Sequence, residues 1–194
     1  MTARSLVRAL AFAGALLLPL IASATVVMEL TVEEMTARAA LVVRGTVQGS
    51  KAVQVDGSIW TLTTITVTEK LKGAGTARIT VKQPGGVVAG IRQAVSGTAR
   101  FTEGDDVVLF LEPTNEAQVY LVQGLAAGSV SLEVINGQKS AVRHLDGLGF
   151  ARAGSQRVQR VENLDRLGSA DAFLERVRGA ARNKPTPPAT RGAQ

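Results

Sequence analysis

The sequence predicts a mainly β protein, organised as a small Greek-key barrel with a short N-terminal helix and an amphipathic C-terminal helix. Three observations carry this prediction. Short runs rich in β-branched residues alternate with turns marked by glycine, proline and asparagine. The run Val107–Leu111 is apolar throughout, as in a strand buried on both faces. Asn136-Gly137 stands between two further runs, which is a strong hairpin signal.

The composition allows one domain and limits its chemistry. The chain has 194 residues, 45% of them hydrophobic, which is enough for a single core with short appendages. It contains no cysteine. Disulfide bonds, thiolate nucleophiles, cysteine metal ligands and lipid attachment to an N-terminal cysteine are therefore excluded.

The first 24 residues resemble a secretory signal peptide. Arg4 and Arg8 precede an uncharged apolar run over residues 9–24, and this run ends in the small residues Ala-Ser-Ala. A positive start, an apolar centre and a small-residue end are the features that a signal peptidase requires. We therefore expect cleavage between Ala24 and Thr25.

An uncleaved membrane anchor is the alternative for this segment. Residues 9–28 carry no charge and are together long enough to span a bilayer. Pro19 and the Ala-Ser-Ala end favour cleavage. The cleaved protein is expected to be exported, to the periplasm or the medium, and to keep no stable membrane span.

The positive charge of the chain belongs to its C-terminal part. Residues 25–150 hold 11 Lys and Arg against 12 Asp and Glu, whereas residues 151–194 hold 9 against 4. A nucleic-acid-binding domain usually carries a basic stripe with aromatic residues on its folded core. The near-neutral core therefore predicts no nucleic-acid partner.

The folded part is expected to begin with a helix that leads into a strand. Thr31 and Glu34 have the spacing of a capping box, and Met35 with Ala39 marks one apolar side. Leu41–Val47 then reads as the first strand.

The next predicted strand, Ile59–Glu69, changes its apolar face midway. Trp60 and Leu62 have one parity, whereas Ile65 and Val67 have the other. Such a change predicts a β-bulge or a bend, as at the corner of a barrel. A Gly-rich connection and a strand over residues 77–83 follow.

Four further strands are predicted in the second half of the domain. Val107–Leu111 is expected to lie centrally in the sheet, and Val119–Val122 to continue it. The hairpin around Asn136-Gly137 has two possible registers. A two-residue loop pairs Leu132 with Ala141, whereas a three-residue loop places the apolar residues of both strands on one face. We prefer the three-residue loop.

Residues from Asn163 to about Arg182 have a helical pattern, with Ser169 as a possible cap. The apolar side of this helix holds Leu164, Leu167, Phe173, Leu174 and Val177. The arginine-rich helix could lie on an anionic membrane surface, but docking on the domain is preferred. The predicted division is a domain over 25–150, a helical segment over 151–183, and a proline-rich disordered tail over 184–194.

Within about residues 30–125, the chain resembles a group of uncharacterised exported bacterial proteins. The resemblance lies in four runs: ALVVRGTV, TTITVTEKLKG, ITVKQPGG and FTEGDDVVLFLE. Their strand plan is similar to the OB-like barrel of netrin modules and tissue metalloprotease inhibitors. The resemblance implies a barrel rather than an immunoglobulin-like sandwich, and an inhibitor-like binding function. The inhibitors ligate the protease zinc through an N-terminal cysteine, and this chain has none, so that mechanism does not carry over.

The stretch VKQPGGVVAG, residues 81–90, raises the question of a phosphate-binding loop. That motif needs G-x-x-x-x-G-K-[ST] before a helix, and here Ile91 and Arg92 follow Gly90. The glycines therefore predict turns in a long exposed excursion over residues 84–104.

This excursion is the predicted recognition site, with Gly85, Gly86, Arg92 and Arg100 as its residues. The two arginines are the only charges between residues 82 and 103, so an acidic partner is expected. The alternative is a plain hairpin without a partner, in which residues 87, 88 and 91 pair with Val95 and Phe101.

No catalytic set is recognised. His144 is the only histidine, which predicts no metal site, and G-x-S-x-G is absent. Asp105 and Asp106 lack the calcium-loop spacing. We therefore expect no cofactor and predict an exported non-enzymatic β-domain that binds a protein or a cell-envelope component. A hydrolase with a carboxylate pair that the sequence does not identify is the alternative.

Overall fold

The structure, a computed structural model, describes residues 25–151, 158–160 and 163–183. The predicted signal peptide and C-terminal tail lie outside these residues. The mainly β prediction is confirmed, with one large sheet and two helices. The elements are β1 (Thr25–Met28), α2 (Val32–Arg38), β2 (Leu41–Val55), β3 (Ser58–Lys72), β4 (Arg78–Pro84), β5 (Gly86–Val88), β6 (Ile91–Gln93), β7 (Asp106–Pro113), β8 (Val119–Val122), the 3₁₀ helix η1 (Leu125–Gly128), β9 (Ser129–Ile135), β10 (Gln138–His144), β11 (Leu148–Ala151), β12 (Val158–Arg160), β13 (Leu164–Ser169) and α3 (Ala170–Arg182).

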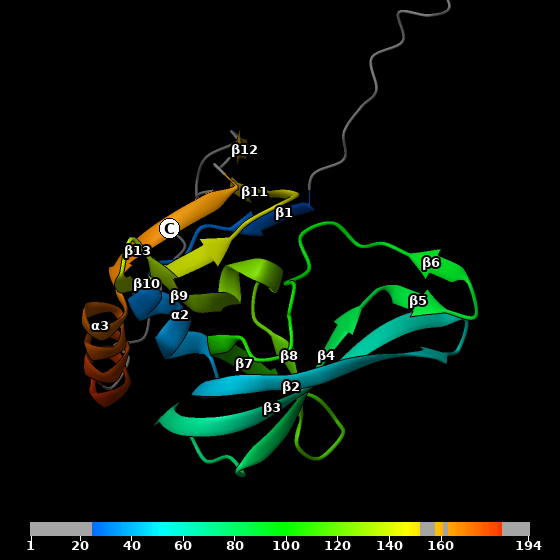
Figure 1. Ribbon diagram of the computed structural model, residues 1–194, viewed down its shortest axis with the longest axis horizontal. Helices are drawn as coiled ribbons and strands as arrows, with labels where there is room; N and C mark the ends of the chain where they lie inside the picture. Colours follow the sequence, from blue (N-terminus) through cyan, green and yellow to red (C-terminus); the bar gives the residue numbers. More distant parts are fainter. Residues whose placement is uncertain (1–24, 152–157, 161–162, 184–194) are drawn as a thin grey trace, which may run out of the picture.

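Eight strands form the large sheet in the order β13-β10-β9-β7-β2-β3-β4-β8, and β7 also pairs with β8 (Figure 1). The strands β2, β3, β4, β8 and β7 therefore form a closed circuit of hydrogen-bonded neighbours. Within this circuit, the β4–β8 pair is parallel and the others are antiparallel. A separate small sheet has the order β1-β11-β12, and β5 pairs with β6.

The strand β7 separates two apolar clusters, because its successive side chains point to opposite faces. Val107, Leu109 and Leu111 lie in one cluster with residues from β2, β3, β4 and β8. Val108 and Phe110 lie in the other, against α2 and α3. All five side chains are almost fully buried, which confirms the prediction of a central strand covered on both faces.

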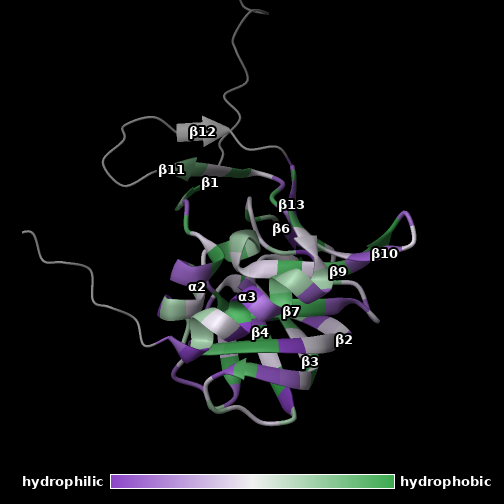
Figure 2. Ribbon diagram, turned by 90° about the vertical axis from the view of Figure 1, so that its left-hand side faces the viewer, coloured by the Kyte–Doolittle hydropathy of each residue, from purple (hydrophilic) through white to green (hydrophobic). Residues whose placement is uncertain are grey.

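The N-terminal helix begins as predicted. The Thr31 backbone N–H donates to Glu34 Oε2 at 2.9 Å, and Thr31 Oγ1 accepts from the Glu34 N–H at 3.1 Å. Met35 and Ala39 are buried. The helices α2 and α3 pack against each other at one side of the molecule (Figures 1 and 2).

The strands β2 and β3 form a long hairpin, here called the arm, along which β4 also pairs with β3 (Figure 1). The strand β2 continues well past its predicted end at Val47, to Val55, whereas β3 exceeds its predicted range by only one residue at its start and three at its end. Their register shifts at three places, one of them where Arg44 faces Glu69 and Gly45 faces Val67. The strand β3 therefore has a β-bulge at Thr68, and not between Leu62 and Ile65, where the change of apolar face predicts one. The change of apolar face has another cause, since β3 pairs with β4 without a shift from Trp60 to Thr66. Trp60 lies on the opposite face from Ile65, with Lys82 Nζ 5.0 Å from its ring centroid.

The preferred register of the β9–β10 hairpin is wrong. Ile135 faces Gln138 and Leu132 faces Ala141, so the loop is the two-residue Asn136-Gly137. Both loop residues have positive φ, 51° and 78°, as a type I′ turn requires. Val134 is 72% exposed, because the end of the hairpin extends beyond the core. It can therefore face the polar Lys139 across the hairpin without loss of buried apolar contact.

The helical prediction from Asn163 is wrong for its first turns. Residues Leu164–Ser169 form strand β13, which pairs with β10 and shifts register between Ala141 and Val142. The helix α3 begins only after Ser169, whose Oγ accepts from the Ala172 N–H at 3.3 Å. Its apolar side, with Phe173, is buried against the domain, which confirms docking.

An ion-pair cluster joins three strands at the start of β7. Arg44 Nε and Nη2 donate to the two Asp106 carboxylate oxygens at 3.0 and 2.7 Å, and Lys139 Nζ lies 2.6 Å from Asp106 Oδ2. Burial raises the pKa of Asp106, but the hydrogen bonds from Arg44 and Lys139 lower it by more, to below its ordinary value of 3.8.

We expect Asp106 to make stability depend on pH in the acidic range. A carboxyl with a lowered folded-state pKa stabilises the fold above its unfolded-state pKa, and this contribution is lost as the pH falls through the folded-state value. Asp106→Asn should lower the free energy of unfolding by about 1–3 kcal/mol at neutral pH. Urea unfolding should show this difference shrinking below about pH 4. A difference that stays constant down to about pH 3 would contradict the assignment.

Candidate functional site

The strand β4 ends at a turn that only glycine fits. Gly85 has φ 96°, and a Cβ atom there would lie 2.8 Å from the Gln93 carbonyl oxygen. At Gly86 a Cβ atom would lie 2.8 Å from Thr61 Oγ1. The two glycines therefore let the chain fold back closely over the arm, from Pro84 to β5.

The segment after this turn is a short hairpin. Val87 faces Arg92 and Val88 faces Ile91, so β5 and β6 pair with each other rather than with Val95 or Phe101. This hairpin lies along the β2–β3 arm (Figure 1).

The rest of the predicted excursion is anchored to the domain rather than projecting from it. The Ser96 carbonyl accepts from Thr25 Oγ1 at 3.0 Å, and the Gly97 carbonyl accepts from the Ala126 N–H at 2.8 Å. Gly97 is buried. The prediction of a long exposed excursion is therefore wrong for this part, because η1 and β11 cover it.

A cleft of about 470 Å³ lies between the arm and this loop. Its lining includes all four residues that the sequence indicated, Gly85, Gly86, Arg92 and Arg100. The strands beneath contribute Ser50, Thr61, Thr63 and Gln83. Sequence reasoning missed these four polar residues. The threonines at alternate positions of β3 indicate a polar face of that strand, but the sequence does not show that this face lies under the loop.

Most polar groups of the cleft floor are already hydrogen-bonded. Thr61 Oγ1 donates to the Gly85 carbonyl at 2.7 Å, and Ser50 Oγ lies 2.7 Å from Thr63 Oγ1. Gln83 Nε2 donates to the Ala99 carbonyl at 3.2 Å. These bonds hold the floor in place, so a ligand would meet a preformed surface rather than one that must be ordered.

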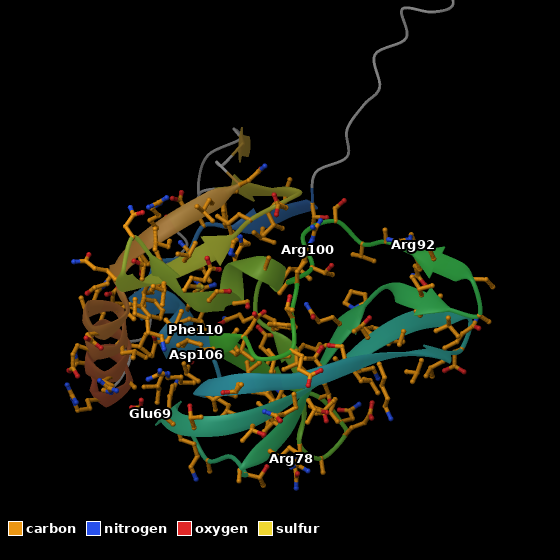
Figure 3. All side chains as sticks on the ribbon, viewed as in Figure 1. Glu69, Arg78, Arg92, Arg100, Asp106 and Phe110 are labelled. Carbon is orange, nitrogen blue, oxygen red and sulfur yellow. The ribbon has the colours of Figure 1, made fainter. Side chains whose placement is uncertain are left out.

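The cleft is positively charged. Arg92 and Arg100 are exposed, and neither forms an ion pair with any residue in the described part of the chain. The residues that line the cleft include no aspartate, glutamate or histidine. In Figure 3, Arg92 and Arg100 come from β6 and the loop that follows it. An unpaired guanidinium can bind a carboxylate through two parallel hydrogen bonds.

Three large apolar side chains are exposed on the arm and on the hairpin that lies along it. Val55 is 46% exposed, Val87 49% and Ile91 59%. Exposed apolar groups beside a polar, charged surface are a common feature of protein-binding sites.

The other candidate groups lie outside the cleft. His144 Nε2 is 2.6 Å from Glu133 Oε1 on the β9–β10 hairpin. Asp105 Oδ2 accepts from the Thr102 N–H at 2.7 Å, a bond that stabilises the turn before β7. Glu69 is bonded to Arg178, with both Oε atoms accepting at 2.9 Å.

Within the described residues, no group of three or more His, Asp or Glu side chains is placed to hold a metal ion. The same part of the chain contains no helix with the length and apolar character needed to cross a bilayer. No protein-family model matches the sequence, and a search of curated proteins also finds no match.

Proposed function

We propose that this protein is an exported, non-enzymatic binding domain that captures an acidic segment of a protein or cell-envelope component. The cleft under the β5–β6 hairpin is the binding site. One observation carries the proposal: Arg92 and Arg100 have no ion-pair partner among the described residues and lie above a polar floor, in a cleft whose lining has no carboxylate. A cationic cleft attracts anionic groups and increases their rate of association.

The lining of the cleft supports binding rather than hydrolysis there. A carboxylate-based hydrolase needs two carboxyl groups across a cleft, and none lines this one. Asp106, Glu69 and Asp165 are each bonded to an arginine. These ion pairs give the three carboxylates structural roles.

We also propose an OB-like Greek-key barrel and an exported mature chain. The closed circuit of β2, β3, β4, β8 and β7, with one parallel pair, supports the barrel. Thr25 is the first residue of β1, and its backbone N–H donates to the Gly147 carbonyl at 3.2 Å. A chain that begins at Thr25 would keep this contact, so the sheet is compatible with cleavage after Ala24.

A pair of arginine substitutions tests the binding site. The double variant Arg92→Gln/Arg100→Gln should bind a fluorescent polyglutamate peptide at least about tenfold more weakly than the parent protein, since two charge contacts are lost. Fluorescence anisotropy at constant salt measures this affinity.

The control variant Arg166→Gln/Arg182→Gln removes the same charge from two exposed arginines outside the cleft. It should keep nearly the parent affinity. An equal loss in both double variants would show attraction to the net charge alone and would refute a specific cleft.

A further inference from the structure

The strand β6 is an edge strand. Among the residues that the structure describes, it pairs only with β5, and β5 lies between β6 and the arm (Figure 1). An edge strand presents unpaired N–H and C=O groups, which can pair with another extended chain. The outer side of β6 is therefore open to the addition of a further strand.

The register of the β5–β6 hairpin shows which main-chain groups face this outer side. Its two-residue turn, at residues 89–90, has φ of 49° and 80°. Val88 and Ile91 flank the turn and bond to each other, so the next pair, Val87 and Arg92, does not. The N–H and C=O of Arg92 therefore point away from β5. No group within the described part of the chain bonds to them.

The side chains at this edge are cationic and apolar in turn. Arg92 is exposed and has no ion-pair partner among the described residues. Ile91 points to the opposite face of the hairpin and is 59% exposed. A charge on an edge strand can also protect it from pairing with other chains. Protection and recognition differ in outcome, because a protected edge binds no added strand.

We propose that the acidic segment captured by the cleft adds to β6 as an antiparallel strand. This inference rests on the proposed function, because residues 92–95 line the same cleft. The main chain of the segment bonds to the N–H and C=O of Arg92. Antiparallel pairing is the more stable arrangement per residue.

Strand addition also specifies the side chains of the partner. A residue directly opposite Arg92 lies on the same face of the sheet, where a carboxylate pairs with the guanidinium. The residues on either side of it lie on the face of Ile91, where apolar side chains are favoured. The partner is thus an extended segment in which acidic and apolar residues alternate, rather than any polyanion.

Fluorescence anisotropy with three labelled peptides tests the strand addition. The first is a short peptide of alternating valine and glutamate, and the other two carry N-methyl groups on the glutamates or on the valines. In the antiparallel arrangement the glutamate N–H groups point to β6 and the valine N–H groups point away. N-methylation of the glutamates should therefore weaken binding at least about tenfold, and N-methylation of the valines less than about threefold.

A pair of variants tests the apolar contact. Ile91→Ser should weaken binding of the unmethylated peptide about fivefold and leave polyglutamate binding nearly unchanged. The control Val134→Ser removes an exposed apolar side chain from a hairpin outside the cleft, and should change neither affinity. Both positions are exposed, so both variants should fold. The amide of Arg92 should exchange hydrogen more slowly in the complex, because its N–H gains a bond.

Equal affinity for the three peptides, or a greater loss with N-methylvaline, would overturn the strand addition. An unchanged affinity in Ile91→Ser would overturn the apolar contact. In either case the cleft would stand if the double arginine variant still lost polyglutamate binding. No binding of polyglutamate or of the alternating peptide at millimolar concentration would overturn both proposals and leave β6 as a protected edge.

Discussion

Gly97→Ala is expected to lower the free energy of unfolding by about 2–5 kcal/mol. Gly97 has φ 80°, which costs a residue with a side chain about 1–2 kcal/mol. A Cβ atom there would also lie 2.2 Å from Leu148 Cδ2 and 2.9 Å from Leu148 Cγ. Leu148 is 3% exposed and has little room to move, so overpacking adds about 1–3 kcal/mol.

Gly90→Ala is the matched control for this prediction. Gly90 also has φ 80°, but no atom lies within 4 Å of the position its Cβ would take. Its cost should therefore be the backbone term alone, about 1–2 kcal/mol. Urea unfolding of both variants gives the difference. Equal destabilisation would show that the loop yields without strain and is not fixed against β11.

Gly97→Ala should also weaken binding of the acidic peptide, because Gly97 lies between Val95 and Thr98, which line the cleft. Moving the loop off Leu148 would shift Arg100 relative to the floor. The structure thus connects the packing of a buried glycine with the geometry of the proposed binding site.

Phe110→Ala is expected to lower the free energy of unfolding by about 3–5 kcal/mol. Phe110 is fully buried in the cluster that joins β7 to α2 and α3. Removing the ring loses its burial and leaves a cavity that its neighbours, held by two helices and a sheet, can fill only in part. This is a large part of the total free energy of unfolding of a typical domain, which is roughly 5–15 kcal/mol.

Val134→Ala is the control for Phe110→Ala. Val134 is 72% exposed, and the substitution should change the unfolding free energy by no more than about 0.5 kcal/mol. Thermal and urea unfolding measure both variants. A cost below about 1 kcal/mol for Phe110→Ala would mean that the helices are not packed on β7 as described.

Elements determined by short-range interactions were predictable from the sequence. The capping box of Thr31 and Glu34 needs only residues of one helical turn. The apolar run Val107–Leu111 indicates burial on both faces whatever covers it. The position of the Asn136-Gly137 turn follows from the positive φ that its residues tolerate.

Elements whose form depends on a distant partner were not predictable. Leu164 and Leu167 suit a helix as well as a strand, and the free edge of β10 makes this segment a strand. The register of the β9–β10 hairpin is set by the two-residue turn at Asn136-Gly137 rather than by the apolar pattern, because Val134 lies beyond the core. Pattern rules assume that the core covers the whole strand, and here it does not.

The candidate site shows the same division. By itself the sequence determined that the chain turns at Gly85 and Gly86, and that the only charges between Lys82 and Glu103 are those of Arg92 and Arg100. Only the tertiary structure decided that Ser50, Thr61 and Thr63 lie beneath them, and that the buried Gln123 Oε1 has no donor within the described part of the chain. The reason is physical: turn geometry and charge are properties of a few adjacent residues, whereas a cleft needs long-range strand pairing to bring distant segments together.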